Sequence, residues 1–413
     1  MLKIGVQALG TVSENGLRTG ISRIKNASFD CIDYNLEVHL SAQEIRAGKP
    51  SIFFDQSLEE LKIYFSEHKK ILPEYDLAIS QMHAPFPVYE YWWKDEEKEQ
   101  MSNYMLEVTK KSIAICSYLN CRYLVVHPFT IRYELGDEKE RTLNIKFFSK
   151  LIPYAKKHNV VICLENLFYG KNGRIIEGIC SSGEEAVSYI DELNRIAGQE
   201  CFGFCFDVGH ANILGKDMFH MLCTLNNRLK ILHIHDNDAV YDLHMMPYSY
   251  TKGYNYCSTD WDGFLSGLKA IEYDGVISFE TFRCMNNYPK FIQNQILSMI
   301  YHLGRYFISR INLKQFVGKR NLVLFGAGNM FENYMKIYGE QCRPEFVVDN
   351  DSMKWDTMKN GIEIKNPREL LKIEPDNCVI VICNIYYDVI ANQLVEMGIE
   401  EFYQYNEELG GLY

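Results

Sequence analysis

Several features of membrane, secreted and zinc-ribbon proteins are absent from this 413-residue sequence. None of its 13 cysteines forms a Cys-x-x-Cys pair, so a zinc ribbon has no support, and several cysteines lie inside apolar runs, as reduced, buried thiols do. No apolar run reaches the roughly 18 residues of a membrane-spanning helix. The opening segment MLKIGVQALGTV lacks the apolar core and cleavage site of a signal peptide. We therefore expect a soluble, cytoplasmic protein with no membrane partner.

Positive charge is also scarce, since 43 Lys and Arg face 54 Asp and Glu, for a formal net charge of −11. Such a surface is poorly suited to neutralising nucleic-acid phosphates, although a metal-lined cleft can be locally positive inside an acidic protein. Nucleic acid is therefore a disfavoured partner that is not excluded. The length exceeds one ordinary domain, and 47% hydrophobic with 23% charged residues is a globular composition, which predicts two domains.

Apolar runs of strand length alternate with amphipathic stretches of helical length over the first 310 or so residues. Eight β/α repeats in this length predict a (β/α)8 TIM barrel, whose active sites form at the carboxyl ends of the strands. We assign the barrel to residues 1–314. The eight predicted strands are 2–9, 30–37, 76–83, 122–127, 160–165, 202–207, 229–235 and 275–280.

Most of these strands end in a side chain that binds metals well. The segments are MHAPF, VVHPF, CLEN, CFDVGH, LHIHDN and ISFE. Strand alternation puts Val161, Cys163 and Glu165 on one face, and it does the same for the equivalent residues of the other strands, so the polar residues should point into the barrel. They are His83, His127, Glu165, Asp207, His210, His233 and Glu280.

Imidazoles and carboxylates together suit zinc, manganese, iron or cobalt, so a divalent metal is the expected cofactor. Glu165, Asp207, His233 and Glu280 could form one four-ligand site. Such an ion polarises a carbonyl or activates water, and Glu165 and Glu280 could flank a sugar as acid and base. Any one of these residues alone is more often structural, and their recurrence at strand ends favours the metal site. His235 shares a face with His233, so periodicity does not choose between them.

With these motifs, the first 310 or so residues resemble the xylose isomerase-like TIM barrels, a superfamily of sugar isomerases and epimerases that includes endonuclease IV. Its His-x-x-Asp pattern is met by His233 to Asp236, which favours His233 as the ligand. The epimerase-like members imply one zinc or manganese ion held by the four residues named above, with both glutamates as catalytic acid and base groups. They also imply that His210 contacts the substrate as a catalytic residue.

The resemblance to endonuclease IV implies a larger metal centre with nine ligands. All nine have candidates here: His83, His127, Glu165, Asp207, His210, His233, Asp242, His244 and Glu280. The sequence departs from both groups after His244, where an aromatic-rich insertion, MMPYSYTKGYNYCSTDW, replaces a short turn.

Aromatic side chains next to these motifs could form part of a substrate site. They are Tyr248, Tyr250, Tyr254 and Tyr256 in the insertion, and those of the segment Phe86 to Trp93. Sugars and unpaired bases both stack on such rings, while plain packing or a homo-oligomer contact would use them equally well. Arg283 could bind a phosphate or carboxylate of a substrate, or form a surface ion pair.

The remaining residues, 315–413, predict a small Rossmann-like α/β domain. Gly326-Ala-Gly328 follows a strand and opens a helix, and Asp349 ends the next strand, but Phe331 stands where a dinucleotide motif has its third glycine. The segment resembles the small domains at the start of sugar O-acyltransferases, which implies a nucleotide or nucleotide-sugar ligand at Gly326, Gly328 and Asp349. A structural or oligomerisation role is the alternative.

Three functions remain open from the sequence. The favoured one is a metal-dependent isomerase or epimerase acting beside the carbonyl of a sugar or sugar derivative. The second is an endonuclease IV-like phosphoesterase with several metal ions. The third is a non-catalytic protein that binds a sugar or nucleotide-sugar.

Overall fold

The structure is a computed structural model that describes residues 1–171, 173–252, 256–374, 377–406 and 411–412. It divides into two compact units, Met1–Leu303 and Gly304–Tyr413. The predicted boundary after residue 314 lies within helix α15 (Leu313–Val317) and stays a prediction. Among the described residues, the helices are either too short or too polar to cross a bilayer.

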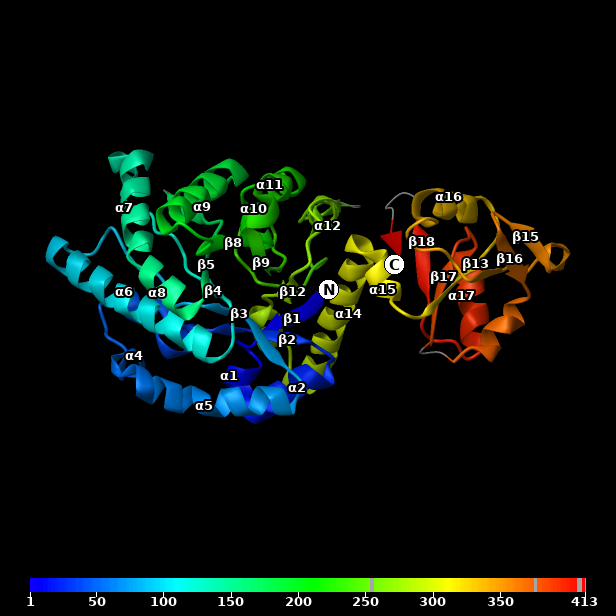
Figure 1. The fold of residues 1–413 in the computed structure, drawn as a ribbon, viewed down its shortest axis with the longest axis horizontal. Helices are drawn as coiled ribbons and strands as arrows, with labels where there is room; N and C mark the ends of the chain where they lie inside the picture. Colours follow the sequence, from blue (N-terminus) through cyan, green and yellow to red (C-terminus); the bar gives the residue numbers. More distant parts are fainter. Residues whose placement is uncertain (172, 253–255, 375–376, 407–410, 413) are drawn as a thin grey trace. The chain divides into compact units, whose positions relative to one another are not determined.

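The first unit is built on eight parallel strands in the spatial order β12-β1-β2-β3-β4-β5-β8-β9. A parallel bridge between Ile234 and Phe279 connects the two outer strands, β9 and β12. The eight predicted strands and the TIM-barrel class are confirmed (Figure 1). The strands are β1 (Lys3–Gln7), β2 (Cys31–Asn35), β3 (Ala78–His83), β4 (Tyr123–Val125), β5 (Val161–Glu165), β8 (Phe202–Asp207), β9 (Leu229–His233) and β12 (Val276–Phe279).

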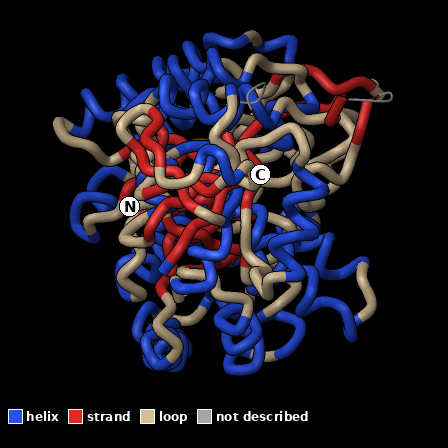
Figure 2. Tube along the Cα trace, turned by 90° about the vertical axis from the view of Figure 1, so that its right-hand side faces the viewer, coloured by secondary structure: helices blue, strands red, loops and turns tan. Residues whose placement is uncertain are grey.

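Helices lie around these strands (Figures 1 and 2). The helix Leu58–Glu74 begins with a reciprocal cap, in which the Ser57 hydroxyl accepts from the backbone N–H of Glu60 and the Glu60 carboxylate accepts from that of Ser57. At the start of the longest helix, Asp95–Tyr118, the Glu97 carboxylate accepts from the backbone N–H of Lys94. The helices are α1 (Val12–Asn15), α2 (Leu17–Asn26), α3 (Ala42–Arg46), α4 (Ile52–Asp55), α5 (Leu58–Glu74), α6 (Asp95–Tyr118), α7 (Asp137–Ser149), α8 (Ile152–His158), α9 (Gly183–Ala197), α10 (Val208–Ile213), α11 (Met218–Leu225), α12 (Trp261–Ala270), α13 (Phe282–Asn287) and α14 (Gln293–Ile311).

Short elements complete the loops at the strand ends. A hairpin of β6 (Phe168–Lys171) and β7 (Arg174–Glu177) follows β5, and a smaller one of β10 (Thr251–Lys252) and β11 (Tyr256–Cys257) follows β9. The 3₁₀ turns of this unit are η1 (Leu36–His39), η2 (Tyr133–Leu135), η3 (Asn226–Arg228) and η4 (Lys290–Ile292).

Apolar inward-facing residues fill the barrel beneath its carboxyl end. Val125, Val161, Cys163, Cys205 and Ile231 form one buried cluster. Each strand continues from this layer to a polar residue on the same face, two positions later on β5, β8 and β9. This buried apolar cluster therefore lies beneath the polar residues that end β5, β8 and β9.

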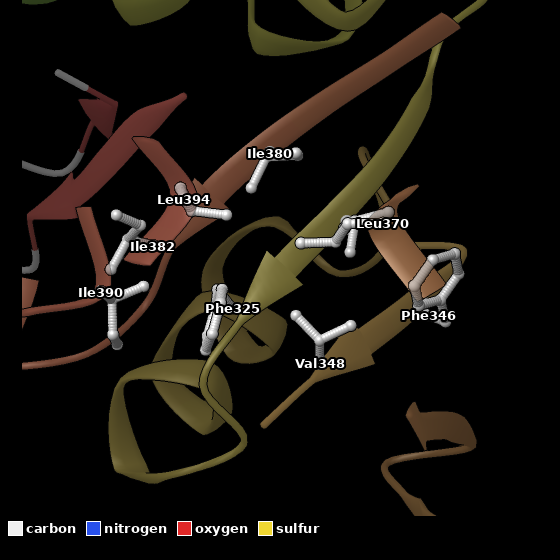
Figure 3. Close-up of a cluster of buried hydrophobic side chains, with 9 residues drawn as sticks. Phe325, Phe346, Val348, Leu370, Ile380, Ile382, Ile390 and Leu394 are labelled. Carbon is white, nitrogen blue, oxygen red and sulfur yellow. The ribbon is translucent and has the colours of Figure 1, made fainter. Parts of the chain in front are cut away.

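The second unit is an α/β domain with one mixed sheet in the order β15-β16-β14-β13-β17-β18-β19. The five middle strands are parallel, whereas β15 and β19 run antiparallel to their neighbours. Its buried core includes Phe325, Val348, Ile382 and Leu394 (Figure 3). The elements are β13 (Asn321–Phe325), α16 (Asn329–Tyr338), β14 (Phe346–Val348), η5 (Ser352–Lys354), β15 (Thr357–Lys359), β16 (Ile362–Lys365), η6 (Pro367–Lys372), β17 (Cys378–Ile382), α17 (Tyr387–Glu396), β18 (Tyr403–Asn406) and β19 (Gly411–Leu412).

Candidate metal centre

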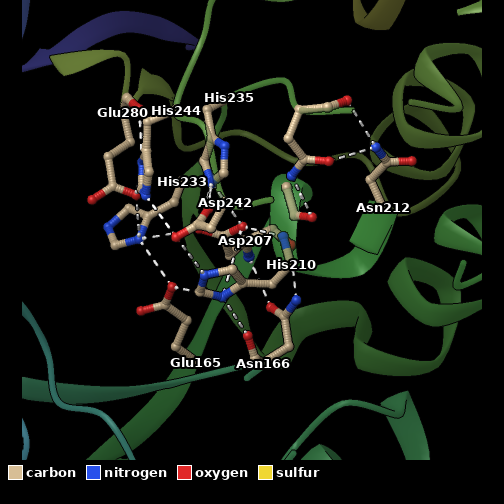
Figure 4. A network of polar contacts seen from close by, with 12 residues as sticks. Glu165, Asn166, Asp207, His210, Asn212, His233, His235, Asp242, His244 and Glu280 are labelled. Atoms are coloured by element: carbon tan, nitrogen blue, oxygen red, sulfur yellow. Dashed lines mark hydrogen bonds and ion pairs between the residues drawn. The ribbon is translucent and has the colours of Figure 1, made fainter. Parts of the chain in front are cut away.

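The nine predicted ligands come together at the carboxyl end of the barrel (Figure 4 labels seven of them). Seven line a cavity of about 440 Å³, while Asp207 and His233 are buried among the others. Each comes from the end of a strand or from the loop or helix that follows it. The cavity-lining ligands are His83, His127, Glu165, His210, Asp242, His244 and Glu280.

The innermost ligands surround one ring nitrogen, Nδ1 of His233. This atom lies 3.3 Å from Oε1 of Glu165, 3.4 Å from Oε2 of Glu280 and 3.9 Å from Oδ2 of Asp207. Ligand atoms of Asp207, His233 and Glu280 all lie within 4.8 Å of one another, as do those of His83, Glu165 and His233. This donor set fits a divalent ion of the zinc or manganese class.

Three polar residues that support this centre were not identified from the sequence. Gln7 donates from Nε2 to Oε1 of Glu280 at 2.7 Å, and Oδ2 of Asp33 lies 3.4 Å from Nε2 of His233. Gln81 in turn donates to Oδ2 of Asp33 at 3.1 Å. All three are buried strand residues, so the alternation that revealed the ligands could have revealed them.

His83 and His127 form a second group around the outer oxygen of Glu165. Nδ1 of His83 is bonded to the carbonyl oxygen of Ala84 at 2.8 Å, which directs Nε2 toward Nε2 of His127, 3.1 Å away. Nε2 of His127 lies 2.9 Å from Oε2 of Glu165, and Nε2 of His83 lies 3.6 Å from it. Glu165 can therefore be shared between two ions.

His210, Asp242 and His244 form a third group at the other side. His210 uses Nδ1 for the carbonyl oxygen of Asn166 at 2.8 Å, and its Nε2 lies 3.8 Å from Oδ2 of Asp242. The same oxygen is 3.0 Å from Nε2 of His244. Asp207 accepts from the backbone N–H of His210 at 2.7 Å as it caps α10, so one carboxylate fixes the start of this helix and faces the centre.

His235 belongs to a different part of the cluster from His233. Its Nε2 lies 3.1 and 3.2 Å from the two oxygens of Asp207 and 3.7 Å from Oδ1 of Asp242. The ring stacks on His244 with centroids 4.0 Å apart. Among the described residues, Nδ1 of His235 and Oδ1 of Asp242 have no hydrogen-bond partner. His233 is therefore the histidine that meets both glutamates.

Burial and opposite charge compete in setting the protonation of the cluster. Burial alone would raise the pKa of Glu165, but His127 and His233 hold it well below its usual value. Burial would lower the pKa of His210, yet Asp207 and Asp242 raise it well above the ordinary value, and the pKa of His235 is raised to about 9. Without an ion the cluster holds protonated imidazoles, and metal binding would release those protons.

Part of the predicted aromatic surface lines the cavity. Phe86, Tyr89 and Trp92 do so, and the Phe86 ring centroid is 4.1 Å from that of His127. The ring of Tyr248 instead packs against that of Trp261 at an interplanar angle of 45°, and the backbone N–H of Tyr250 is bound by Asp236. Tyr254 and the side chain of Tyr256 lie outside the described residues.

Charged and hairpin residues also line the mouth of the cavity. Arg283 does so, while Arg46, paired with Glu90 at 2.9 Å, and Phe168 and Tyr169 of the β6–β7 hairpin were not predicted. These three residues lie at the end of α3 and in the hairpin after β5, outside the repeating β/α pattern, so sequence patterns could not place them.

In the second unit, the carboxylate of Asp349 forms hydrogen bonds with groups of its own domain. Its Oδ2 accepts from the backbone N–H of Ala327 at 2.8 Å and from Nζ of Lys354 at 3.1 Å. Gly326 has a φ of 114°, and a Cβ there would lie 2.6 Å from the carbonyl oxygen of Cys383. The glycine loop is therefore needed for the domain's own packing, and its predicted ligand role stays a prediction.

Comparisons with known proteins relate both units to families. Residues 318–403 match the family described as C2185-like, N-terminal. The uncharacterized protein MJ1311 of Methanocaldococcus jannaschii is 29% identical over 204 residues, 48% of this chain and 63% of that protein, so the chain spans under two thirds of this relative. The ketose 3-epimerase of Arthrobacter globiformis is 30% identical over 105 residues, 25% of this chain and 30% of that enzyme.

Solved structures share the fold of the first unit. A D-tagatose 3-epimerase-like protein matches with a TM-score of 0.52 and 20% identity, over 76% of this chain and all of that one. The IOLI protein, whose structure has a bound zinc atom, matches with a TM-score of 0.50 and 17% identity, over 76% and 99% of the two chains. Residues 24–295 match the family model for the xylose isomerase-like TIM barrel. Because that match covers well over half of the sequence, the protein belongs to the xylose isomerase-like TIM barrel family.

Proposed function

We propose that this protein is a metal-dependent isomerase or epimerase of a sugar or sugar derivative. The observation that carries the proposal is the placement of Glu165 and Glu280, whose carboxylates approach Nδ1 of His233 to 3.3 and 3.4 Å within one cavity. The names of the ketose 3-epimerase and the D-tagatose 3-epimerase-like protein support a sugar substrate with a carbonyl group.

A divalent ion would be held by Glu165, Asp207, His233 and Glu280, and zinc or manganese suits these donors. When bound, it would polarise the substrate carbonyl and make the neighbouring C–H more acidic. The residues of the chain supply the proton transfer. One glutamate removes the proton beside the carbonyl and the other returns one, which inverts a centre or moves the carbonyl.

Surrounding contacts prepare the glutamates and the substrate for this transfer. The bond from Gln7 fixes Oε1 of Glu280 and leaves Oε2 facing His233. His127 holds Oε2 of Glu165. The rings of Phe86 and Trp92 line the cavity and offer faces on which a sugar can stack.

Hydrogen exchange with solvent tests this proposal directly. Full-length protein loaded with manganese or zinc is incubated in D₂O with D-fructose, D-tagatose or L-ribulose, and deuterium is measured at C1 and C3 by NMR. We expect incorporation, with loss of at least 100-fold in Glu280→Gln or Glu165→Gln and little change in Glu107→Gln on the exposed face of α6. Unchanged exchange in both active-site variants would remove the glutamates from the acid and base roles.

We propose a phosphoesterase with several metal ions as the second candidate, because all nine ligands converge in three groups. Glu165 would be shared by two ions, a common feature of multinuclear hydrolytic centres. Metal analysis of protein purified without chelator separates the candidates. About three equivalents of zinc with cleavage of abasic-site DNA would favour the phosphoesterase, and one equivalent without cleavage would favour the epimerase.

A further inference from the structure

A second cavity, of about 480 Å³, adjoins the metal cavity at the carboxyl ends of β1 and β2 (Figure 1 shows these strands and α5). Leu9 and Asn35 line both cavities. Both volumes lie in the range of small-molecule sites, so the pair could accept a ligand with two parts. We call this second space the side cavity; the other residues that line it are Ala8, Val12, Gly16, Leu17, Tyr34, Val38, His39, Tyr64, Glu67 and His68.

The side cavity has a buried polar group in its wall. The hydroxyl of Tyr34 lies 3.4 Å from Nε2 of His39 and 3.2 Å from Nε2 of His68. Burial lowers the pKa of both histidines to about 4, so both rings are neutral at pH 7. His68 is only 6% exposed, and its Nδ1 has no hydrogen-bond partner among the described residues. A neutral imidazole donates through one ring nitrogen and accepts through the other, so this wall carries hydrogen-bonding groups without a positive charge.

One face of α5 adds side chains of the kinds that bind sugars. Tyr64, Glu67 and His68 are three and four residues apart and therefore lie on one side of the helix. Tyr64 is 46% exposed and gives an aromatic face, and Glu67 gives an acceptor for hydroxyl groups. The described residues that line the cavity include no lysine or arginine, which disfavours a phosphate or carboxylate ligand.

We propose that the side cavity binds the second sugar unit of an oligosaccharide or glycoside whose first unit occupies the metal cavity. The proposal rests on the proposed sugar-directed function and narrows it to a neutral substrate larger than a monosaccharide. Apolar and aromatic walls with a few hydrogen-bonding groups match the alternating C–H and O–H surfaces of such a unit. The shared residues, Leu9 and Asn35, lie where the two units would be joined.

Binding of matched sugars tests the proposal. D-fructose is compared with its 4-O- and 6-O-glucosyl derivatives, maltulose and isomaltulose, by calorimetry on the metal-loaded full-length protein. At least one disaccharide should bind ten-fold or more tightly than D-fructose. Val38→Trp, a substitution of a half-exposed residue that would fill the side cavity, should remove this advantage and leave D-fructose binding unchanged. Val395→Trp, at an exposed valine of α17, is the matched control.

A second variant in the side cavity checks that a loss of binding does not come from misfolding of Val38→Trp. Tyr64→Ala should also weaken disaccharide binding by three-fold or more, whereas Tyr386→Ala, at an exposed tyrosine of the other unit, should not. Equal affinity for D-fructose and both disaccharides, unchanged in Val38→Trp and Tyr64→Ala, would overturn the proposal even if D-fructose is epimerised. A lost disaccharide advantage in both variants, without turnover of any sugar, would support the side cavity and count against the proposed catalysis.

Discussion

Gly209 lies directly beneath the ring of His235, which leaves no room for a side chain. A Cβ at this position would overlap the Cε1, Nδ1 and Nε2 atoms of that ring. The ring is held on its other side by stacking on His244 and at Nε2 by Asp207. The position of His235, and through it the carboxylate of Asp207, therefore depends on a glycine in α10.

Gly209→Ala should displace His235 and weaken the metal centre. Overpacking of a rigid core typically costs about 1–3 kcal/mol in the free energy of unfolding. We expect a loss of this size in denaturant unfolding and at least ten-fold weaker binding of zinc by calorimetry. Gly170→Ala, at a strand position with open space around it, is the control and should change neither value. Wild-type stability and zinc affinity in Gly209→Ala would show that the ring moves without cost.

Replacement of His233 should weaken metal binding more than replacement of His235. His233→Ala removes the nitrogen that faces both glutamates, so zinc affinity should fall by more than 100-fold. His235→Ala removes a partner of Asp207, and loss of such supporting contacts typically costs about 10–100-fold. Competition with a coloured chelator measures both affinities. A larger effect of His235→Ala would make it the principal ligand.

The convergence of the candidate ligands was predictable because chemistry and spacing coincide in them. Metal-binding side chains end several strands in succession, and strand alternation turns those of β5, β8 and β9 inward. His235 was ambiguous because it lies on the same face as His233 and follows it by two residues. In the structure, the His235 ring lies against Gly209, whereas the His233 ring faces both glutamates.

Helices and loops were less predictable than single ligands. Residues 138–158 have a continuous helical pattern, but the chain forms α7 and α8 because Pro153, at the start of α8, cannot continue the hydrogen bonds of α7. The insertion after His244 is arranged by Asp236, which accepts from the backbone N–H groups of Ser249 and Tyr250 and from the hydroxyl of Thr259. Such long-range anchors carry no local signal, so the aromatic residues of the insertion could not be placed in advance.

The packing of α5 against β2 should make the barrel unit sensitive to mild acid. The groups around the His68 ring are Tyr34, His39, Tyr64 and Phe65, with Glu67 beside it on the helix. The pKa of His68 is about 4 in the folded protein, against about 6.5 in an unfolded chain. Its contribution to stability is therefore full above pH 6.5 and falls as the pH drops toward 4, because the unfolded state then binds more protons.

His68→Gln should reduce this pH dependence. Between pH 7 and pH 5 the wild-type barrel should lose about 2 kcal/mol more than the variant, in urea unfolding of metal-free protein. His220→Gln, at an exposed histidine paired with Glu184, is the matched control and should behave like the wild type. An equal loss in His68→Gln and wild type would mean that His68 is protonated in both states.

At the scale of the whole molecule, the eight-stranded class of the first unit could be predicted because each repeat carries its own strand and helix pattern. The second unit was predicted to be a small Rossmann-like α/β domain; the structure shows an α/β domain with one mixed sheet, and the Rossmann-like assignment stays a prediction. Its outer strands, β15 and β19, pair antiparallel, and the orientation of a short edge strand depends on its turn rather than on its composition. Gly326 and Asp349 satisfied a ligand-binding pattern although both have packing roles within the domain.

Removal of metal should lower the stability of the first unit and leave that of the second unit unchanged. An ion that binds only the folded barrel stabilises it by about 2.7 kcal/mol when present at 100 times its dissociation constant, which is about 5–10 °C in Tm for a unit of this size. The candidate ligands all lie within Met1–Leu303, so a chelator should speed amide exchange in barrel peptides and leave peptides of Gly304–Tyr413 unchanged. Hydrogen-exchange mass spectrometry reports both units in one experiment, and zinc in excess of chelator should restore the barrel. Equal destabilisation of both units, or of neither, would contradict a structural contribution of metal confined to the barrel.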